Sequence, residues 1–373
     1  MASAPQPHSL QTFITQHSAR GELCQLLPER AVRCVACGHR CYLPDGKIGI
    51  CQVRRNRDGV LYVPRGYVAA LQCDPVEKKP FFHVRPGALA LSFGMLGCDY
   101  HCGYCQNWIT SQALRDPVAG VLPHACSAEY IVRRAIEAGA EIVASTYNEP
   151  LITSEWAVEV FKVAKARGLT TAYISNGNAT PEVLAYLRPW VDLYKVDLKS
   201  FNDKQYRKLG GTLDTVKESI QQLVAAQFWV EVVTLVVPGF NNSDDELGAI
   251  ARFLASVSLD IPWHVTAFRP EYKMTDRDCT TAETLRRAAR NGRAAGLRHV
   301  YAGNLPGHVG DDEHTRCPHC GAVVIERSGF RILALHLTDG CCAGCGTAIA
   351  GRWGDRRTAH QGRGATLPRR VAI

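Results

Sequence analysis

Three cysteines stand close enough together in the sequence to hold an iron–sulfur cluster. They lie in the segment Cys98-Asp-Tyr-His-Cys102-Gly-Tyr-Cys105, which has the spacing C-x3-C-x2-C. Each thiolate can bind a different iron of a four-iron cluster. Because the segment has no fourth cysteine, one iron keeps an open position for another ligand. The same residues leave one alternative open, a zinc site of these three cysteines completed by His101.

Four cysteines near the C-terminal end have the spacing of a closed metal site. Cys317-Pro-His-Cys320 and Cys342-Ala-Gly-Cys345 are two C-x2-C pairs, and each pair is followed by glycine. Four thiolates in such pairs form a tetrahedral zinc site that stabilises a small fold and keeps no open position for catalysis. We therefore predict a zinc-ribbon-like module over residues 311–350, with Zn²⁺ as its metal.

A third group of cysteines lies in the N-terminal part of the chain. Cys34, Cys37, Cys41 and Cys51 supply four thiols within a short segment, and His39 lies among them. Zinc binding would stabilise a segment that has few core residues of its own. A second iron–sulfur cluster remains equally open, because sets of four thiolates hold both kinds of metal group.

The composition makes metal binding the first use to consider for the cysteines. The chain has 373 residues with 16 cysteines, and 46% of its residues are hydrophobic. It has no apolar run of the length that a membrane span needs, and its polar start lacks the features of a signal peptide. We therefore expect a cytoplasmic protein, and in reducing surroundings cysteines bind metals more often than they form disulfides.

The net charge of +8 is concentrated at one end of the chain. Residues 351–373 hold six arginines against one aspartate, which is +5 of the total and leaves +3 for all other residues. This glycine-rich segment predicts a basic flexible tail. A basic tail can contact nucleic acid, but the small net charge elsewhere argues against a nucleic-acid-binding protein.

Segments with strand and helix patterns alternate through the middle of the chain and must position the cysteines. We predict strands at residues 89–93, 141–147, 171–175, 191–198, 229–237, 263–268 and 298–302, and helices at 128–138, 155–167, 213–226, 244–256 and 281–295. This repetition predicts an α/β fold with a parallel sheet covered by helices. A partial (β/α) barrel is favoured over a doubly wound sheet, because polar residues recur directly after the strands, where barrel enzymes build their sites.

The cysteine loop and the blocks around it resemble a known family. A C-x3-C-x2-C loop with an aromatic residue before its last cysteine, after the first strand of a βα array, resembles the radical SAM superfamily. The chain is similar more specifically to the AmmeMemoRadiSam-system radical SAM enzymes, which are related to the activating enzymes of pyruvate formate-lyase. The blocks that carry this similarity are 74–83, 105–108, 146–150, 175–177, 197–199, 236–239 and 268–274.

The resemblance implies two cofactors and their chemistry. A [4Fe-4S] cluster on Cys98, Cys102 and Cys105 would bind the amine and carboxylate of S-adenosylmethionine at its open iron. One electron from the reduced cluster would cleave the S–C5′ bond. The resulting 5′-deoxyadenosyl radical would abstract hydrogen from a substrate that the residues do not identify. In such enzymes the protein supplies placement and the exclusion of water.

The resemblance also implies residues that bind S-adenosylmethionine. Glu149 stands in a Glu-Pro pair where activating enzymes have the turn Gly-Gly-Glu-Pro, and a carboxylate can pair with an ammonium group. Asp197 and Lys199 fall on one face of a strand, where a structural ion pair is the alternative. His264 matches a Pro-Tyr-His pattern, where a core histidine is the alternative. The full set is Asn148, Glu149, Ser175, Asn176, Asp197, Lys199 and His264.

On this view the chain has five parts. They are an N-terminal extension (1–30), a cysteine-rich region (31–85), a radical SAM core (86–310), the zinc-ribbon-like module (311–350) and the basic tail (351–373). The implied partners are a reductant such as flavodoxin or ferredoxin, and AMME-type and Memo-type proteins. Gln106, Asn107 and the segment Tyr272–Met274 are candidates for substrate contact at the expected mouth of the barrel.

Two other functions are alternatives to this one. An activase that places a glycyl radical on a partner enzyme would use the same chemistry. The N-terminal cysteines, however, lack the C-x2-C-x2-C-x3-C runs of activases with extra clusters. A zinc-ribbon protein that binds nucleic acid would use the barrel as a scaffold, and only Trp353 with the arginine-rich tail points to it.

Overall fold

A nine-stranded sheet forms the centre of the molecule. We describe it from a computed structural model, which places residues 7–354 and 369–371. The strand order is β16-β15-β14-β13-β12-β11-β9-β8-β22, and the sheet is open because its edges are β16 and β22. Parallel pairing joins β9 (Leu89–Gly94), β11 (Ile142–Ser145), β12 (Thr170–Ser175), β13 (Leu193–Asp197), β14 (Trp229–Val236), β15 (Trp263–Ala267) and β16 (Val300–Gly303).

Two antiparallel strands complete one edge of this sheet. β8 (Ala70–Pro75) pairs with β9, and β22 (Arg369–Arg370) pairs with β8. The prediction of an α/β fold with a mostly parallel central sheet is therefore confirmed. Of the predicted basic tail, residues 355–368 and 372–373 lie outside the described residues.

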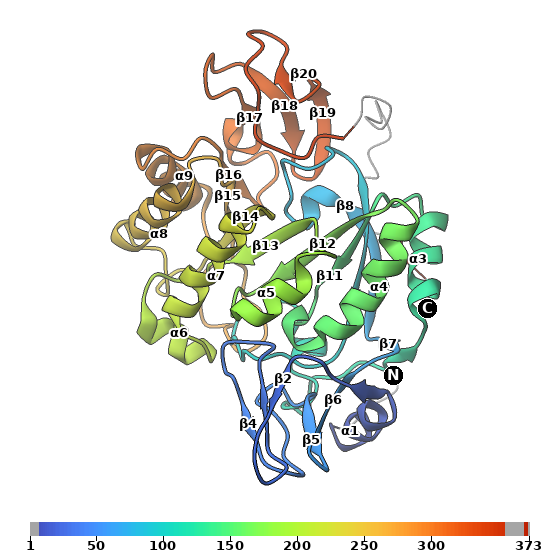
Figure 1. The fold of residues 1–373 in the computed structure, drawn as a ribbon. Coiled ribbons are helices and arrows are strands. Elements are labelled where there is room, and N and C mark those ends of the chain that lie inside the picture. Colours follow the sequence, from blue (N-terminus) through green and yellow to red (C-terminus); the bar gives the residue numbers. More distant parts are fainter. Residues whose placement is uncertain (1–6, 355–368, 372–373) are drawn as a thin grey trace.

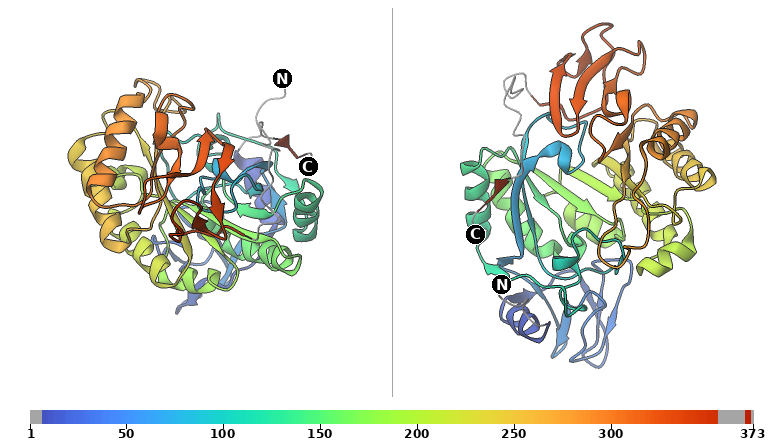
Figure 2. Two further views of the ribbon diagram at one scale, coloured as in Figure 1. Left: turned by 90° about the horizontal axis from the view of Figure 1, so that it is seen from above. Right: turned by 180° about the vertical axis from the view of Figure 1, so that it is seen from behind.

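Helices follow most of the parallel strands and cover one face of the sheet (Figure 1). Figure 2 shows them in an arc around the curved sheet. The open central sheet together with these helices is called the barrel below. The helices are α3 (Ala128–Glu137), α4 (Ser154–Ala166), α5 (Pro181–Leu187), α6 (Asp203–Leu209), α7 (Leu213–Ala225), α8 (Asp244–Val257) and α9 (Ala282–Ala294). Shorter helical turns are α2 (Trp108–Ser111), η1 (Val76–Lys78), η2 (Pro150–Thr153) and η3 (Gly310–Glu313).

Side-chain caps mark the starts of several helices. Ser127 accepts a hydrogen bond from the backbone N of Tyr130 and so caps the start of α3. Helices α5 and α6 were not predicted, because seven residues give too short a periodic pattern. Their start signals are nevertheless present: Thr180 caps α5 ahead of a proline, and Asn202 caps α6.

The head, residues 7–64, packs against one end of the central sheet (Figure 1). It contains α1 (Pro7–Gln16) and two small sheets of β1 (Ser18–Arg20), β5 (Arg55–Arg57) and β6 (Val60–Pro64), and of β2 (Cys24–Leu26), β3 (Val32–Cys34) and β4 (Tyr42–Leu43). Between head and barrel, β7 (Tyr67–Val68) pairs with β10 (His124–Ala125).

Buried contacts join the head firmly to the barrel. Val32, Cys37 and Leu61 belong to the same hydrophobic core as the barrel strands. The Arg54 guanidinium is 1% exposed and donates to both carboxylate oxygens of Glu155 on α4, each over 2.7 Å. A bidentate buried pair of this kind fixes the orientation of the two parts as well as their contact.

The C-terminal module, residues 311–350, lies at the opposite end of the sheet from the head (Figure 1). It contains β17 (Thr315–Arg316), β18 (Val323–Ser328), β19 (Arg331–Leu335), β20 (Leu337–Thr338) and β21 (Cys341–Cys342). Its own small core includes Cys317, Val324 and Ile349. The Arg327 side chain is 1% exposed and donates to the Phe82 carbonyl oxygen over 2.7 Å, which anchors the module to the barrel.

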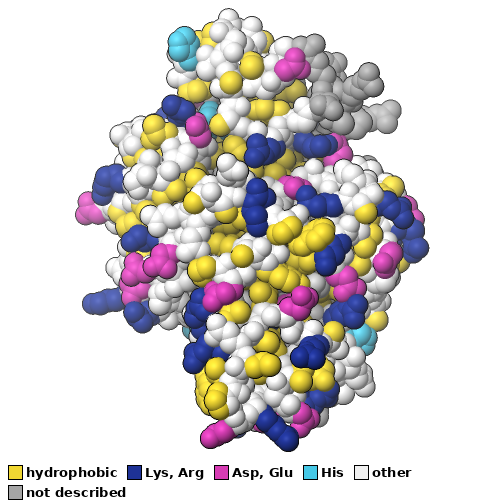
Figure 3. All heavy atoms as spheres, viewed as in Figure 1, with side chains coloured by type: hydrophobic (Ala, Val, Ile, Leu, Met, Phe, Trp, Pro, Cys, Tyr) yellow, Lys and Arg dark blue, Asp and Glu magenta, His cyan; other side chains and the backbone are white. Residues whose placement is uncertain are grey.

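The surface carries charges of both signs. On the face drawn in Figure 3, the lysines and arginines of the described residues are interspersed with aspartates and glutamates. None of the helices in the described part of the chain has the length and apolar character needed to cross a membrane.

Candidate active site

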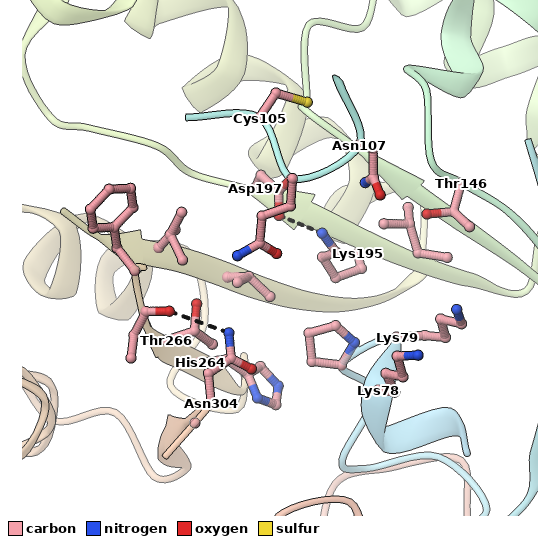
Figure 4. Close-up of a pocket in the computed structure, with 18 of the residues that line it drawn as sticks. Lys78, Lys79, Cys105, Asn107, Thr146, Lys195, Asp197, His264, Thr266 and Asn304 are labelled. Carbon is pink, nitrogen blue, oxygen red and sulfur yellow. Dashed lines mark hydrogen bonds and ion pairs between the residues drawn. The ribbon is translucent and has the colours of Figure 1, made fainter. Parts of the chain in front are cut away.

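A cavity of about 820 Å³ opens at the carboxyl ends of the parallel strands. In this architecture the strand ends are where functional side chains gather. The thiols of Cys98, Cys102 and Cys105 all belong to its wall. Figure 4 shows Cys105 and Asn107 on one side of the cavity, with Lys78, Lys79 and His264 around the rest of its wall.

The cluster loop, residues 98–105, follows β9 and is braced by the head. Gly97 has φ +88°, and a Cβ there would lie 2.8 Å from the backbone O of Cys51. Only glycine therefore lets the head approach this loop so closely. The three cysteines of the loop are free thiols.

The spacing of these thiols suits a cluster better than a single ion. In the described part of the chain they do not form a set of ligand atoms within 4.8 Å of one another. A cubane places each thiolate on a different iron, so its ligands stand wider apart than the ligands of one ion. The three thiols and their common cavity therefore fit a [4Fe-4S] cluster.

Burial disfavours charge on these thiols. It raises the pKa of Cys102 to about 12, and the nearby Lys199 ammonium opposes that rise. Burial, followed by the carboxylates of Asp99 and Glu149, raises the pKa of Cys98 well above its ordinary value. A positively charged metal group would remove this penalty by stabilising the thiolates.

Glu149 is hydrogen-bonded to two of the other predicted residues, Ser175 and Asn176. Its Oε1 accepts from the Ser175 hydroxyl over 2.7 Å and from the Leu151 backbone N over 3.1 Å. Its Oε2 accepts from the backbone N of Asn176 over 2.6 Å. Burial, and then the neighbouring Asp99, raises the pKa of Glu149 to about 8. A cation bound beside it would favour its ionised form.

The turn before Glu149 keeps a glycine-like backbone without glycine. Tyr147 has φ +71°, a left-handed conformation that favours glycine. The turn ends β11 two residues earlier than we predicted. Asn148 ties the turn to the segment between β9 and the cluster loop, because its Oδ1 accepts from the backbone N of Met95 over 2.8 Å.

Asp197 lies between two lysines in the cavity wall. It forms an ion pair with Lys195, and Lys199 Nζ lies 3.2 Å from its Oδ2. Burial would raise the pKa of Asp197, but the two lysines outweigh this effect and lower it to about 2. Lys195 was not predicted from the sequence. Its position two residues before Asp197, on the same strand face, is the signal that could have found it.

His264 lines the cavity but is also held in the core. Its Nε2 lies 2.7 Å from Oε2 of Glu231, and its ring meets the Phe82 ring edge-on with centroids 4.8 Å apart. His264 is therefore a hydrogen-bonded core histidine that also lines the cavity, and its contact with S-adenosylmethionine stays a prediction.

Only some of the candidates for substrate contact line the cavity. Gln106 and Asn107 belong to the cavity wall. The segment Tyr272–Met274 is not among the described residues that line it. Tyr272 instead stacks on Trp108, with ring centroids 5.2 Å apart, and the Lys273 backbone N donates to the Gly103 oxygen over 2.9 Å. This segment braces the cluster loop from outside.

Two lysines were also not predicted from the sequence, Lys78 at the end of η1 and Lys79 directly after it. Lys79 is 6% exposed, and its Nζ lies 2.7 Å from Asp74 Oδ2 and 3.2 Å from the Tyr147 hydroxyl. Lys78 Nζ lies 2.9 Å from the other oxygen of Asp74. The pattern Asp-x3-Lys-Lys placed both cations near one carboxylate and was a readable signal.

The four cysteines of the C-terminal module converge on one point. Cys317 Sγ and Cys345 Sγ lie 3.6 Å apart, and Cys320 Sγ and Cys342 Sγ lie 3.7 Å apart. All four sulfur atoms lie within 4.8 Å of one another. This is a Cys₄ site with room for a metal ion.

The head cysteines are arranged differently. In the described part of the chain, Cys34, Cys37, Cys41 and Cys51 do not form one set of ligand atoms within 4.8 Å. Cys37 is instead grouped with His39 and Asp99. The four-thiolate head site therefore stays a prediction.

The sequence of the chain is similar to that of known proteins. Residues 94–254 match the family model described as "Radical SAM superfamily". An uncharacterized protein of Methanocaldococcus jannaschii, MJ0808, is 36% identical over 329 residues, which are 87% of this chain and 96% of that protein.

Two further similarities are to activating enzymes. An isethionate sulfite-lyase activating enzyme of Oleidesulfovibrio alaskensis is 25% identical over 144 residues, 37% of this chain and 46% of that enzyme. A solved domain of a pyruvate-formate lyase-activating enzyme from Bacteroides vulgatus has 19% identity and a TM-score of 0.39, and the match covers 43% of this chain and 98% of that domain. The chain is an enzyme that belongs to the radical SAM superfamily.

Proposed function

We propose that this enzyme holds a [4Fe-4S] cluster on Cys98, Cys102 and Cys105 and, with S-adenosylmethionine, removes a hydrogen atom from its substrate. The observation that supports this most is the position of the three free thiols, which share one cavity with the Glu149 carboxylate. The parallel strands contribute further polar side chains to this cavity, among them Asp197 on β13 and Thr266 on β15.

When bound, the cluster and S-adenosylmethionine supply one-electron cleavage of the S–C5′ bond and hydrogen abstraction. The side chains of the cavity wall would bind these groups and orient them. Glu149 holds the turn of Ser175 and Asn176 in place and offers a carboxylate for the methionyl ammonium group. Lys199, held by Asp197, favours the thiolate form of Cys102.

The motif blocks support a finer assignment to the AmmeMemoRadiSam-system radical SAM enzymes. This assignment implies AMME-type and Memo-type proteins as partners. A reductant such as flavodoxin or ferredoxin would supply the electron, because the chemistry consumes one electron for each cleavage of S-adenosylmethionine.

We also propose that the C-terminal module is a zinc ribbon with one Zn²⁺ on Cys317, Cys320, Cys342 and Cys345. A tetrahedral ion with zinc–sulfur bonds of about 2.3 Å has sulfur–sulfur edges of about 3.8 Å. The observed edges of 3.6 and 3.7 Å agree with that value. A cubane would need wider edges, because each sulfur would bind a different iron.

Cluster loading and cofactor binding test the first proposal. Anaerobic reconstitution with iron and sulfide should give four irons more in the wild type than in the Cys98→Ala, Cys102→Ala, Cys105→Ala variant. Addition of S-adenosylmethionine should then change the electron paramagnetic resonance spectrum of the reduced cluster. Equal iron in both proteins, or a spectrum that the cofactor leaves unchanged, would contradict the proposal.

A second candidate is the activation of a glycyl-radical enzyme. It is favoured by the similarity to an isethionate sulfite-lyase activating enzyme and to a choline trimethylamine-lyase activating enzyme, both of Oleidesulfovibrio alaskensis. The chain covers less than half of either enzyme. A glycyl-radical signal on a partner incubated with the reduced enzyme and S-adenosylmethionine would support this candidate and identify a glycine of that partner as the site of hydrogen abstraction.

A further inference from the structure

Three segments that are distant in the sequence meet at the Asp99 carboxylate. Asp99 belongs to the cluster loop, directly after Cys98. The head contributes Cys37 and His39, and the turn after β12 contributes amide groups. One thiol, one imidazole nitrogen and one carboxylate oxygen lie within 4.8 Å of one another there.

Asp99 is a buried carboxylate without a cationic partner from lysine or arginine. Its side chain is 0% exposed, and its two oxygens accept from Asn176 Nδ2 and Asn178 Nδ2, each over 2.8 Å. Among the described residues, no lysine or arginine forms an ion pair with it. A buried carboxylate held only by neutral donors is costly unless a positive charge is supplied nearby.

The distances suit a single small ion. Cys37 Sγ lies 3.6 Å from His39 Nδ1, and His39 Nδ1 lies 3.8 Å from Asp99 Oδ2. A tetrahedral ion with bonds of about 2.3 Å to sulfur and about 2.0–2.2 Å to nitrogen and oxygen has edges of about 3.4–3.6 Å. The donor atoms are therefore close to their bonding positions already.

The hydrogen bonds of His39 leave its Nδ1 unprotonated, so this nitrogen can bind a metal. His39 Nε2 lies 2.6 Å from the backbone oxygen of Gly210, which can only accept, so Nε2 carries the hydrogen. Nδ1 then has a lone pair directed to the side of Cys37 and Asp99. Asn178 Nδ2 lies 3.0 Å from it, so a bound ion replaces one hydrogen bond, and Asn178 keeps its bond to Asp99.

The segment that carries two of the ligands is fitted closely to the barrel. The Gly38 backbone N donates to the Asn178 oxygen over 2.8 Å. A Cβ on Gly38 would lie 2.4 Å from Asn178 Oδ1. Glycine is required between Cys37 and His39 for this approach, so the site is held rigidly between head and barrel.

We propose that Cys37, His39 and Asp99 bind one divalent transition-metal ion, and that its donor set selects Zn²⁺. A mixed set of one sulfur, one nitrogen and one oxygen donor suits zinc, a metal of borderline softness. Asn176 and Asn178 orient the carboxylate as outer-shell partners. The ion ties the head to the cluster loop beside Cys98. This proposal is independent of the one for the cavity.

Zinc content measures this site apart from the cluster. The parent is the full chain with Cys98, Cys102 and Cys105 replaced by alanine, so that no cluster forms on the loop. After dialysis against zinc, His39→Ala in this parent should lower the zinc content by one equivalent per chain. Cys41→Ser should leave it unchanged, because Cys41 lies outside the set.

X-ray absorption at the zinc edge is a second readout that needs no further variant. We expect nitrogen or oxygen scatterers at about 2.0–2.2 Å besides sulfur at about 2.3 Å. Zinc bound by sulfur alone would overturn the proposal. So would a loss of one zinc in Cys41→Ser, or four irons and sulfide bound by the parent through the head cysteines, since each means a four-thiolate site.

Discussion

The backbone N of Asn176 donates to Glu149 Oε2 over 2.6 Å, although 27 residues separate the two in the sequence. This bond joins the turn after β11 to the turn after β12. Through Ser175 and Leu151, the same carboxylate accepts two further hydrogen bonds. Glu149 is thus a structural centre of the cavity wall as well as a candidate partner for a bound ammonium group.

Replacing Glu149 with alanine should destabilise the protein. The change leaves the donors of Leu151, Ser175 and Asn176 without their acceptor in a buried site, which costs on the order of 2–3 kcal/mol. Urea unfolding at pH 6 measures this, because the raised pKa of Glu149 keeps its carboxyl group protonated in the folded state there, so the cost of ionisation does not offset the lost hydrogen bonds. Glu159→Ala is the matched control, since Glu159 lies on α4 in an exposed pair with Arg65 and should cost less than about 1 kcal/mol.

The raised pKa of Glu149 predicts a pH dependence of stability in the metal-free protein. Its pKa of about 8 lies above the unfolded value of about 4.5, so the folded state binds more protons between these values. Stability is therefore lost as the pH rises through 8. Between pH 6 and pH 8.5, the wild type should lose on the order of 2–3 kcal/mol relative to Glu149→Gln. Parallel stability curves for the two proteins would refute this assignment.

Lys195 should prove necessary for the ionised state of Asp197. In Lys195→Met, Asp197 keeps only its ion pair with Lys199. The free energy of unfolding at pH 7 should then be about 1–3 kcal/mol lower than in the wild type. The effect is moderate because the Asp197 side chain is 31% exposed. The pKa of Asp197 is depressed to about 2, so the stabilisation is lost as the pH falls from about 4 towards 2.

The difference between wild type and Lys195→Met should therefore shrink in acid. Lys217→Met is the control, because Lys217 pairs with the exposed Asp214 on α7. A difference that stays constant down to pH 2 would mean that Lys195 acts through packing and not through Asp197.

Replacing a C-terminal cysteine should lower the stability of the C-terminal module more than it weakens cofactor binding. Cys320→Ala removes one of four ligands of a closed site, so the module should lose its metal and unfold more easily. Zinc content and the rate of proteolysis within residues 311–350 measure this. Because Gly329 and Phe330 of this module line the cavity, cofactor binding should weaken moderately without being abolished. A metal-free module that resists protease as well as the wild type does would contradict the structural role of the metal.

The sequence predicted the repeating elements well where their patterns were long. The strand expected at 229–237 is Trp229–Val236, and the helix expected at 244–256 is Asp244–Val257. The short helices α5 and α6 were missed, because a pattern of seven residues is too brief to stand out. The strand expected to reach Tyr147 ends at Ser145, because the left-handed backbone of Tyr147 begins a turn.

Site residues that stand in local sequence motifs could be predicted. Contacts between segments that are distant in the sequence could not, because they depend on how the chain folds. Glu149, Ser175 and Asn176 were predicted separately, but their mutual hydrogen bonds depend on the pairing of β11 with β12. The meeting of His39 with Asp99 depends on how the head docks, which neither segment encodes locally. Tyr272 lies on a loop whose path is set by stacking on Trp108, so its distance from the cavity could not be read from its motif.

The most direct measurement of the central claim is the formation of 5′-deoxyadenosine from S-adenosylmethionine by the reduced, reconstituted enzyme without oxygen. We predict formation by the wild type, none by Cys102→Ala, and retained formation in Cys41→Ser, whose thiol lies outside the cavity wall. No 5′-deoxyadenosine from wild-type enzyme loaded with four irons, or equal amounts from Cys102→Ala, would contradict the account.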